Sequence, residues 1–416
     1  MGNFVGGPSP RQSELSSVPV VRGRRLVTLY NEDMQPQLIH EEALDFGLSS
    51  LLTAAESESA TPTTFPPASR HAYVLVHGLS AFSTDLKVLE TILMENGSPV
   101  LCSSENEWTE SFKGVLECGE ALVREITSFR ELHPELSFIS LVGNSLGGVL
   151  IRVASKMLKD LDWLGLQPYF FMTIACPHIG VRNHTYLEDQ LLGTKLPDAV
   201  RGPVVGLMAA ALRKTGRELL MHDDDDLRSC LLYSLATDQA YLSALAEFRE
   251  RRVYANLYND LVVPLGTAAF LDDANCALLR EKHAGEAGVV AIVHVPPCAS
   301  PSASALNSAS AEAEQEQVDR EAGAVMRGMC ERLDSVGWTK VIVHYKGILP
   351  TAHSKLAAID RFPRYLHDEV LNFKEGRGCM EAAGRWLSGA GEGVKADAHL
   401  DQEANPVASK SLSLGV

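Results

Sequence analysis

Short apolar runs alternate with stretches of helical spacing from residue 73 onward. The runs are Tyr73–Val76, Phe138–Val142, Tyr169–Ala175, Val253–Tyr258 and Lys340–Tyr345. Apolar runs of this length are typical of strands that are buried on both faces of a parallel sheet. We therefore expect them to be strands of one sheet.

Two stretches between these runs show helical spacing instead. The first extends from Val115 to Phe129, and its pattern stops at His133-Pro134, where a proline favours the end of a helix. The second follows Ser145 and has a single apolar stripe, formed by Leu146, Val149, Leu150, Val153, Ala154, Met157 and Leu158. Strands that alternate with helices predict an α/β fold with a mostly parallel central sheet and helices on both faces.

The chain divides into one domain and two tails. Residues 1–70 mix Ser, Pro, Thr and Glu, and we expect a mostly disordered tail in which Leu26–Tyr30 is compatible with an edge strand. Residues 71–388 carry the strand and helix patterns and form the predicted domain. Residues 389–416 are again polar and are expected to be a disordered C-terminal tail.

Two insertions interrupt the domain. Residues 183–245 show no strand pattern and are expected to be a helical, lid-like segment. Its apolar part, Val204–Leu212, either lines an acyl-chain pocket, contacts a membrane surface or packs on the core. The acidic group Asp223–Asp226 is interpreted as a solvated loop, since no converging metal ligands are apparent. Residues 298–325 are a Ser/Ala/Glu-rich insertion that we expect to be mobile.

The charge balance and composition narrow the function classes. The 416 residues include 37 Lys and Arg against 53 Asp and Glu, a net charge of −16, so nucleic acid is not an expected partner. No apolar run approaches the roughly 20 residues that span a bilayer, and the first residues lack the apolar stretch of a signal peptide. The eight cysteines show no CxxC pair. We expect an intracellular protein, cytoplasmic or peripherally associated with lipid surfaces.

One motif has the context that nucleophilic catalysis requires. Gly143-Asn144-Ser145-Leu146-Gly147 matches G-x-S-x-G, with a predicted buried strand before it and an amphipathic helix after it. In such an elbow the flanking glycines avoid clashes, and the serine hydroxyl stands at the N-terminus of a helix, where developing negative charge is favoured. Ser145 is therefore the candidate nucleophile.

A serine nucleophile needs a base and an acid that orients the base. On a sheet of this kind the chain order is Ser, then Asp or Glu, then His, with each residue on a loop after a strand. Asp260 closely follows the strand Val253–Tyr258, and His353 follows the strand Lys340–Tyr345. Both positions fit the required order.

Other acids and bases fit less well. Asp162 precedes the third predicted strand, and Asp272 and Asp273 lie well past the fourth. His344 falls inside a strand pattern, where a histidine is more often packed than catalytic, and His367 lies on a charged, helix-like segment. Asp260 and His353 are therefore preferred.

The oxyanion of an acyl-transfer intermediate needs two backbone donors. One is expected to be the N–H of Leu146, the residue after the nucleophile. The other should come from the loop after the first strand, from Leu79 or Gly78. His77 is expected to hold that loop by hydrogen bonds rather than to transfer protons.

Several strings together resemble a known family. They are YVLVHGLSAFSTDL, SFISLVGNSLGGVLIRVA, FMTIACPHIGVRNH, RRVYANLYNDLVVPLGTAAF and the AHS around His353. They are similar to the serine esterase family DUF676 of the α/β-hydrolases, which includes lipase-like proteins of yeast and plants. The resemblance covers about 73–280 and about 338–360. It implies an α/β-hydrolase fold and a Ser-Asp-His triad acting on lipid carboxyl esters, with the family's nucleophile, acid and base falling on Ser145, Asp260 and His353.

The chain also departs from the family pattern. Many members have histidine where this chain has Asn144, a position expected to affect packing or substrate contacts. The family's ATPHLG-like string is Ala175–Gly180 here, and its His178 is expected to hold a loop near the site. The insertion at 271–337 is atypical and delays the last strand.

The resulting prediction is a serine hydrolase that cleaves carboxyl esters, of lipids by preference, through an acyl-enzyme. No metal or organic cofactor is required. The expected partners are a lipid or other acyl ester and, transiently, a membrane or lipid-droplet surface. Three alternatives remain open: an acyltransferase, a thioesterase, and a non-catalytic adaptor that keeps the fold.

Overall fold

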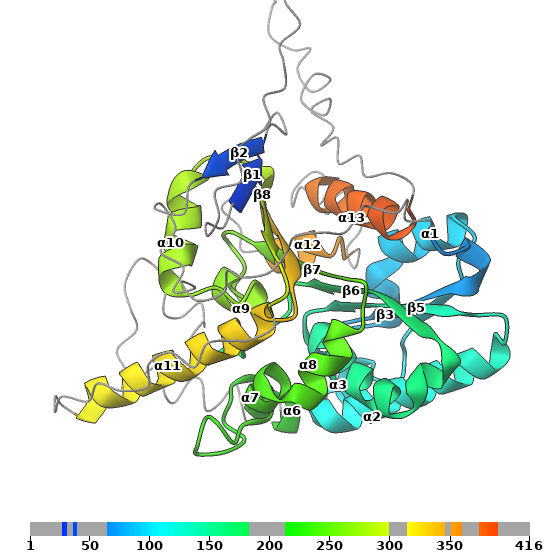
Figure 1. The fold of residues 1–416 in the computed structure, drawn as a ribbon, viewed down its shortest axis with the longest axis horizontal. Coiled ribbons are helices and arrows are strands. Elements are labelled where there is room, and N and C mark those ends of the chain that lie inside the picture. Colours follow the sequence, from blue (N-terminus) through cyan, green and yellow to red (C-terminus); the bar gives the residue numbers. More distant parts are fainter. Residues whose placement is uncertain are drawn as a thin grey trace, which may run out of the picture.

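A seven-stranded sheet forms the centre of the computed structural model, which describes residues 27–30, 36–39, 65–182, 213–298, 314–345, 351–359 and 374–389. The strand order is β4-β3-β5-β6-β7-β9-β8. Figure 1 labels β3, β5, β6, β7 and β8 of this sheet. The strands are β3 (His71–Val76), β4 (Val100–Cys102), β5 (Phe138–Asn144), β6 (Gln167–Ile174), β7 (Glu250–Asn256), β8 (Gly288–Val295) and β9 (Trp338–His344).

The pairing within this sheet is parallel except at one edge. β3, β4, β5, β6, β7 and β9 pair in parallel, and β8 pairs antiparallel with β9. The predicted mostly parallel sheet is confirmed, and all five apolar runs lie in or overlap its strands. Two strands of this seven-stranded sheet were not predicted. β4 is only three residues long, and β8 lies inside the 271–337 segment that the sequence analysis treats as an insertion.

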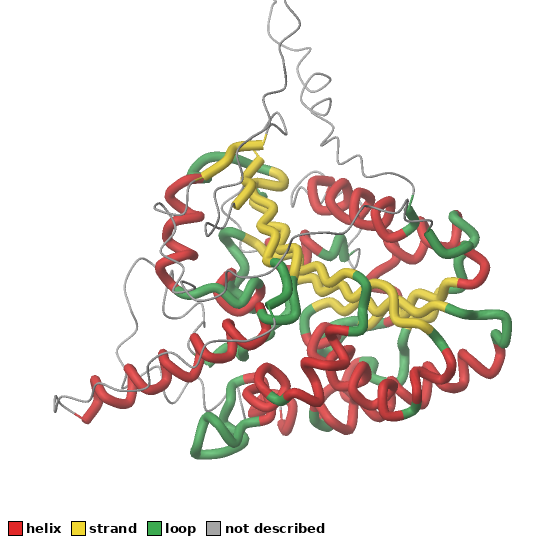
Figure 2. Tube along the Cα trace, in the orientation of Figure 1, coloured by secondary structure: helices red, strands yellow, loops and turns green. Residues whose placement is uncertain are grey.

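Helices cover both faces of the sheet (Figures 1 and 2). One face carries α1 (Lys87–Glu95), α12 (Ala352–Leu356) and α13 (Lys374–Leu387), and its apolar layer includes Leu89, Met380 and Trp386. The other face carries α2 (Val115–Leu132), α3 (Leu146–Asp160), α7 (Leu231–Thr237), α8 (Gln239–Ala246), α9 (Leu265–Ala268), α10 (Asp273–Lys282) and α11 (Glu314–Asp334).

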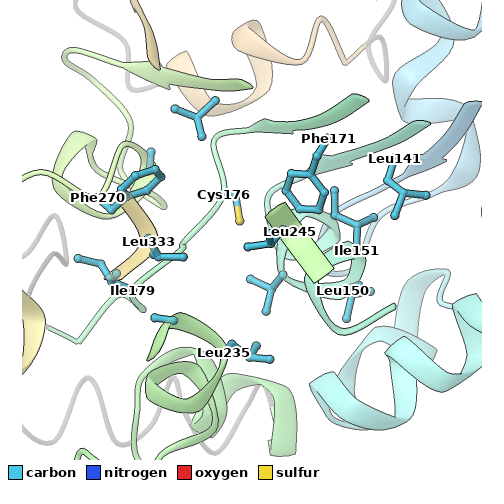
Figure 3. Packing of buried hydrophobic residues seen from close by; sticks show 14 of the residues in the cluster. Leu141, Leu150, Ile151, Phe171, Cys176, Ile179, Leu235, Leu245, Phe270 and Leu333 are labelled. Atoms are coloured by element: carbon cyan, nitrogen blue, oxygen red, sulfur yellow. The ribbon is translucent and has the colours of Figure 1, made fainter. Parts of the chain in front are cut away.

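The second layer shows why the sequence folds this way. Leu141 of β5 and Phe171 of β6 share it with Leu150 and Ile151 of α3 (Figure 3). All four side chains are at most 1% exposed. Burying one such side chain contributes about 1.5–3 kcal/mol, so the apolar stripe of α3 fixes the helix on the sheet directly behind Ser145.

The described part of the inserted segment is helical, with α6 (Arg213–Leu219), α7 and α8. Residues 183–212, including Val204–Leu212, lie outside the described residues. In the Ser/Ala/Glu-rich segment, α11 begins at Glu314, so part of that segment is helical. Residues 299–313 are not described.

The tails are described only in part. β1 (Val27–Tyr30) pairs with β2 (Pro36–Ile39) in a separate two-stranded sheet, so Leu26–Tyr30 is largely a strand. The remaining described elements are short 3₁₀ turns: η2 (Ala68–Arg70), η3 (Ser83–Leu86), η4 (Trp108–Phe112) and η5 (Asp162–Gly165). Among the described residues, every helix is too short or too polar to cross a membrane.

Candidate active site

Ser145 stands between the end of β5 and the start of α3, in a strained turn. Its backbone has φ 53° and ψ −122°, an unusual conformation for a residue with a side chain. The strain is held by neighbouring structure, since the Ser145 N–H donates to the Ile174 carbonyl of β6 at 2.8 Å. The side chain lies at the edge of the sheet, with the residue 8% exposed.

The glycines of the motif are required by close backbone contacts. A Cβ atom at Gly143 would lie 2.4 Å from the Gly147 carbonyl, and one at Gly147 would lie 2.2 Å from the Val76 carbonyl oxygen. Both distances are well inside van der Waals contact. The sharp turn therefore packs β5, the start of α3 and the end of β3 so closely that only glycine fits at either position.

The loop after β3 lies against the nucleophile. A Cβ atom at Gly78 would be 3.0 Å from the Ser145 Cβ. Leu79 follows Gly78 in this loop, and Leu146 is the first residue of α3, whose N–H has no intrahelical acceptor. Within the described residues neither the Leu79 nor the Leu146 N–H donates to a protein acceptor. Both N–H groups therefore remain candidates for the predicted oxyanion donors.

His77 is bonded to the backbone of this loop. It is 2% exposed, and its Nδ1–H donates to the Gly78 carbonyl at 2.9 Å. Burial is the main reason that the pKa of His77 is lowered, although that hydrogen bond and nearby acids oppose the shift. A neutral, buried imidazole bonded to the loop backbone agrees with a positioning role.

The predicted acid and base meet on the segments that follow β7 and β9, with His353 in α12. His353 Nδ1 lies 3.1 Å from each carboxylate oxygen of Asp260. The carboxylate also accepts the N–H groups of Val262, at 3.1 Å, and Val263, at 2.8 Å. Asp260 is 6% exposed, so its charge is compensated by these donors rather than by water. The imidazole is thereby oriented with Nδ1–H toward the acid.

The pKa of His353 reflects this pairing. Burial lowers it, but the charge of Asp260 and the hydrogen bond to its carboxylate raise it, and the net effect is a pKa above the ordinary 6.5. The pairing stabilises the protonated imidazole. This is the electrostatic arrangement expected of a general base that must hold a proton during the reaction.

The sheet topology places the three residues on one edge. Ser145 follows β5, Asp260 follows β7 and His353 follows β9, and these parallel strands end on the same side. β6 separates the first two strands, whereas β7 and β9 are neighbours. Within the described residues, hydrogen bonds join Asp260 to His353, and none joins Ser145 to His353.

The alternative residues lie elsewhere. Asp272 caps α10 by accepting the Asn275 N–H at 2.8 Å, and Asp162 lies in η5, before β6 and at the opposite edge of the sheet. His344 ends β9, and its Nδ1 bonds the Glu286 carbonyl at 2.5 Å. His367 lies outside the described residues. None of the described alternatives reaches the elbow by a hydrogen bond.

Asn144 and His178 are both buried beside the elbow. Asn144 Nδ2 donates to the Ile174 carbonyl at 3.1 Å, so its side chain ties β5 to β6. His178 Nε2 bonds Thr173 Oγ1 at 2.9 Å, and burial lowers its pKa well below the ordinary value. Both contacts lie within the scaffold, which places these two residues in support of the site.

Two further residues escaped the sequence analysis. Arg152 of α3 is fully buried, and its Nη1 donates to the His178 carbonyl at 2.8 Å. Asn256, at the end of β7, is 1% exposed and donates from Nδ2 to Asp260 Oδ2 at 2.7 Å. In the sequence, each is a polar residue within a mostly apolar segment. Whether such a residue is buried, and which group it bonds, cannot be read from the sequence.

In the part of the chain that the structure describes, no group of three or more His, Cys, Asp or Glu side chains is arranged to hold a metal ion. Asp223 instead accepts the Leu231 N–H at 2.8 Å, at the start of α7. The arrangement that remains is a serine on an elbow, two free backbone donors and an oriented imidazole.

Known proteins are similar to this chain over about half of its length. Residues 67–277 match the family described as "Putative serine esterase (DUF676)". Two proteins of Saccharomyces cerevisiae are similar: "Putative lipase ROG1" is 30% identical over 50% of this chain, and "Putative lipase YDL109C" is 30% identical over 48%. The matched part makes up only 30% of each relative.

Solved structures with a similar fold have lower sequence identity to this chain. Carboxyl esterase 2 of the mycorrhizal fungus Tuber melanosporum is 11% identical, covering 91% of this chain and 89% of its own, with a TM-score of 0.42. A Bacillus licheniformis lipase, BlEst2 in its propeptide form, is 15% identical over 48% of this chain and 38% of its own, with a TM-score of 0.31.

Proposed function

Because the chain belongs to the serine esterase family DUF676 and has an α/β-hydrolase fold, we propose that it is a serine hydrolase that cleaves carboxyl esters of lipids. In this proposal Ser145 is the nucleophile, His353 the general base and Asp260 the acid that orients it. The observation that carries the proposal is the Asp260–His353 pair at the same sheet edge as the elbow. A protein that only kept the fold would not need an oriented imidazole there.

The first half of the reaction forms an acyl-enzyme. His353 Nε2 accepts the hydroxyl proton of Ser145 while Oγ attacks the ester carbonyl carbon. The C=O electron pair moves onto the oxygen, which the N–H groups of Leu146 and Leu79 stabilise. Each such donor contributes about 10²–10³ in rate. The imidazolium then gives its proton to the leaving alcohol as the C–O bond breaks.

The second half of the reaction hydrolyses the acyl-enzyme and regenerates the free enzyme. Water enters, gives a proton to His353 Nε2 and attacks the acyl carbon. The second tetrahedral intermediate collapses, and Ser145 Oγ leaves and takes the proton back from the imidazolium. Asp260 keeps its charge throughout and stabilises the protonated ring, which agrees with the raised pKa of His353.

Lipid esters are the proposed substrates because each of the two similar yeast proteins is named "Putative lipase", although this chain spans only 30% of their length. An acyltransferase or a thioesterase would use the same acyl-enzyme, with an alcohol replacing water or a thioester replacing the ester. Product analysis with a competing alcohol, and a comparison of oxygen esters with thioesters of one acyl chain, separate these activities.

The decisive experiment is labelling with a fluorophosphonate probe. Wild type should be labelled, Ser145→Ala should not, and His353→Ala should be labelled about 10³-fold more slowly or not at all. Equal labelling of wild type and Ser145→Ala, or no labelling of wild type, would defeat the proposal and favour an adaptor. For substrate class, p-nitrophenyl esters of long and short acids are compared, and a strong preference for acetate would exclude lipid esters.

A further inference from the structure

Two large aromatic side chains are exposed on neighbouring loops near the candidate site. Phe82 is 38% exposed and Trp108 is 54% exposed, and their rings stack with centroids 5.9 Å apart at 14°. Trp108 has φ 50°, a backbone conformation that bulky residues rarely adopt. Such strain persists only where surrounding structure holds it, and it concentrates at functional positions. We refer to Phe82 and Trp108 as the aromatic pair.

Hydrogen bonds fasten the aromatic pair to the loop that carries the oxyanion donor. The Trp108 N–H donates to the Ala81 carbonyl at 3.0 Å, and the Ser83 N–H donates to the Glu107 carboxylate at 2.8 Å. The Ser80 N–H, next to Leu79, donates to Ser111 Oγ at 2.9 Å. The two rings are therefore held on a rigid support that continues directly to Leu79.

Exposed apolar side chains flank the nucleophile on this edge of the sheet. Phe82 and Trp108 lie on the loops that follow β3 and β4, and Val262, which is 56% exposed, follows β7. In the sheet order, β5 and its Ser145 lie between β3 and β7. In the strand order, exposed apolar side chains therefore lie on both sides of Ser145.

Exposed apolar residues at the opposite edge are scattered instead. Met94, Leu132 and Leu161 are 56%, 77% and 51% exposed, at the ends of α1, α2 and α3. Single exposed apolar residues of this kind are normal on soluble proteins and need no function. They provide matched controls for the aromatic pair.

We propose that the aromatic pair docks the protein on an uncharged or zwitterionic lipid surface and so presents Ser145 to esters in that surface. This inference rests on the proposed function. A lipid surface at this position would supply the ester substrate at the sheet edge that carries Ser145. Aromatic side chains are suited to the membrane–water interface.

Acidic residues near the aromatic pair favour an uncharged or zwitterionic lipid surface over an anionic one. Glu105 is exposed next to the pair, and Glu107 lies on the same loop with its pKa lowered by the hydrogen bonds from Ser83. Both belong to the 53 Asp and Glu residues that give the chain its formal net charge of −16 at pH 7. Because like charges repel, an anionic surface is disfavoured and docking depends on apolar contact.

The tryptophan composition makes docking directly measurable. Of the four tryptophans, Trp163, Trp338 and Trp386 are 5%, 3% and 7% exposed, so Trp108 alone reports on the surface. The full chain carrying Ser145→Ala, which prevents turnover, is mixed with phosphatidylcholine vesicles. Trp108 emission should shift to shorter wavelength, and brominated phosphatidylcholine should quench it. Replacing part of the lipid with phosphatidylserine should weaken both responses.

Variants then test the pair. Phe82→Ser combined with Trp108→Gly should lower vesicle binding in sedimentation by about tenfold or more, as expected from the loss of two apolar contacts. Glycine at position 108 also suits the φ of 50°, so the fold should be retained. The same double substitution is then made in the protein that keeps Ser145. There, the ratio of activity on phosphatidylcholine vesicles to activity on a dissolved short ester should fall by a similar factor. Leu132→Ser with Leu161→Ser should leave binding unchanged.

The proposal is overturned if Trp108 emission does not respond to the vesicles, or if the control variant weakens binding as much as the pair variant. It is also overturned if the pair variant loses activity equally on vesicles and on the dissolved ester. Failure of the proposed function is distinguishable, because it appears as absent fluorophosphonate labelling of wild type, while the binding arm uses an inactive variant.

Discussion

The two halves of the candidate site are held in place by different forces. The nucleophile half, at the ends of β3 and β5, is fixed by backbone contacts so close that a Cβ on Gly147 would lie 2.2 Å from a carbonyl oxygen. The acid–base half, at the ends of β7 and β9, is fixed by side-chain hydrogen bonds around Asp260, such as the 2.7 Å bond from Asn256.

Because of this difference, substitutions in the two halves should have different effects on stability and on catalytic rate. Steric packing in a close-packed interior cannot relax without moving backbone, so a side chain added at the glycines of the nucleophile half should act on the whole fold. Hydrogen bonds can be removed one at a time, so changes in the acid–base half should act on rate in graded steps.

Asp260→Asn should lower kcat on a dissolved ester by about 10³–10⁴ while the fold remains. The amide cannot stabilise the imidazolium as the carboxylate does, and it favours the wrong tautomer of His353. The measurement is steady-state kinetics together with urea unfolding. Asp272→Asn is the matched control, because Asp272 only caps α10, and its kcat should be close to wild type. A loss shared by both variants would contradict the assignment of Asp260.

Gly147→Ala should lower the free energy of unfolding by about 3 kcal/mol or more, because the added methyl group meets the backbone of Val76. Urea unfolding followed by circular dichroism measures this. Gly328→Ala is the control, since no atom lies within 4 Å of its added Cβ in α11. There alanine should stabilise the helix by up to about 1 kcal/mol. A Gly147→Ala protein with an unchanged unfolding midpoint would show that the elbow is not sterically fixed.

The same distinction explains what the sequence could predict. Glycines forced by close backbone contact leave a readable motif, so Gly143, Ser145 and Gly147 were assigned together, and the apolar runs around them predicted the central strands. Asp260 and His353 could be selected by their order after strands. β4 escaped prediction because three residues make too short a pattern. β8 has an apolar run of its own and was missed because the sequence analysis treats 271–337 as an insertion.

Residues that act through buried hydrogen bonds leave a much weaker signal. Asn256 lies at the end of an apolar strand and Arg152 within an apolar helix, and nothing in their spacing indicates a partner. Their roles depend on which groups the fold brings within bonding distance, such as Asp260 for Asn256 and the His178 carbonyl for Arg152. The fold must be known before such contacts can be assigned.

Asn256→Ala should lower kcat by about tenfold, an intermediate effect, because one of the hydrogen bonds that orient Asp260 is lost while His353 keeps its partner. The control is Asn106→Ala, which removes a comparably buried amide that bonds the Cys118 carbonyl at 2.9 Å. Both variants should lose similar stability, and only Asn256→Ala should lose rate. If both rates fall equally, Asn256 is structural and does not position the acid.

The smallest expected effect is the pH dependence that the Asp260–His353 pair imposes. Because the folded-state pKa of His353 is raised above its ordinary 6.5, the pair stabilises the fold fully below that value. This contribution is lost as pH rises through the folded pKa. Over the same range kcat/KM should increase, since only the neutral imidazole accepts the Ser145 proton. Urea unfolding and esterase assays across this range measure the two curves.

Asp260→Asn should flatten the stability curve over this range, because His353 then has no charged partner to raise its pKa. The acidic limb of the wild-type rate profile should be centred above pH 6.5. A limb centred at or below that value, with stability independent of pH, would mean that Asp260 does not hold a charged imidazole. The acid–base half would then be fixed by packing, like the nucleophile half.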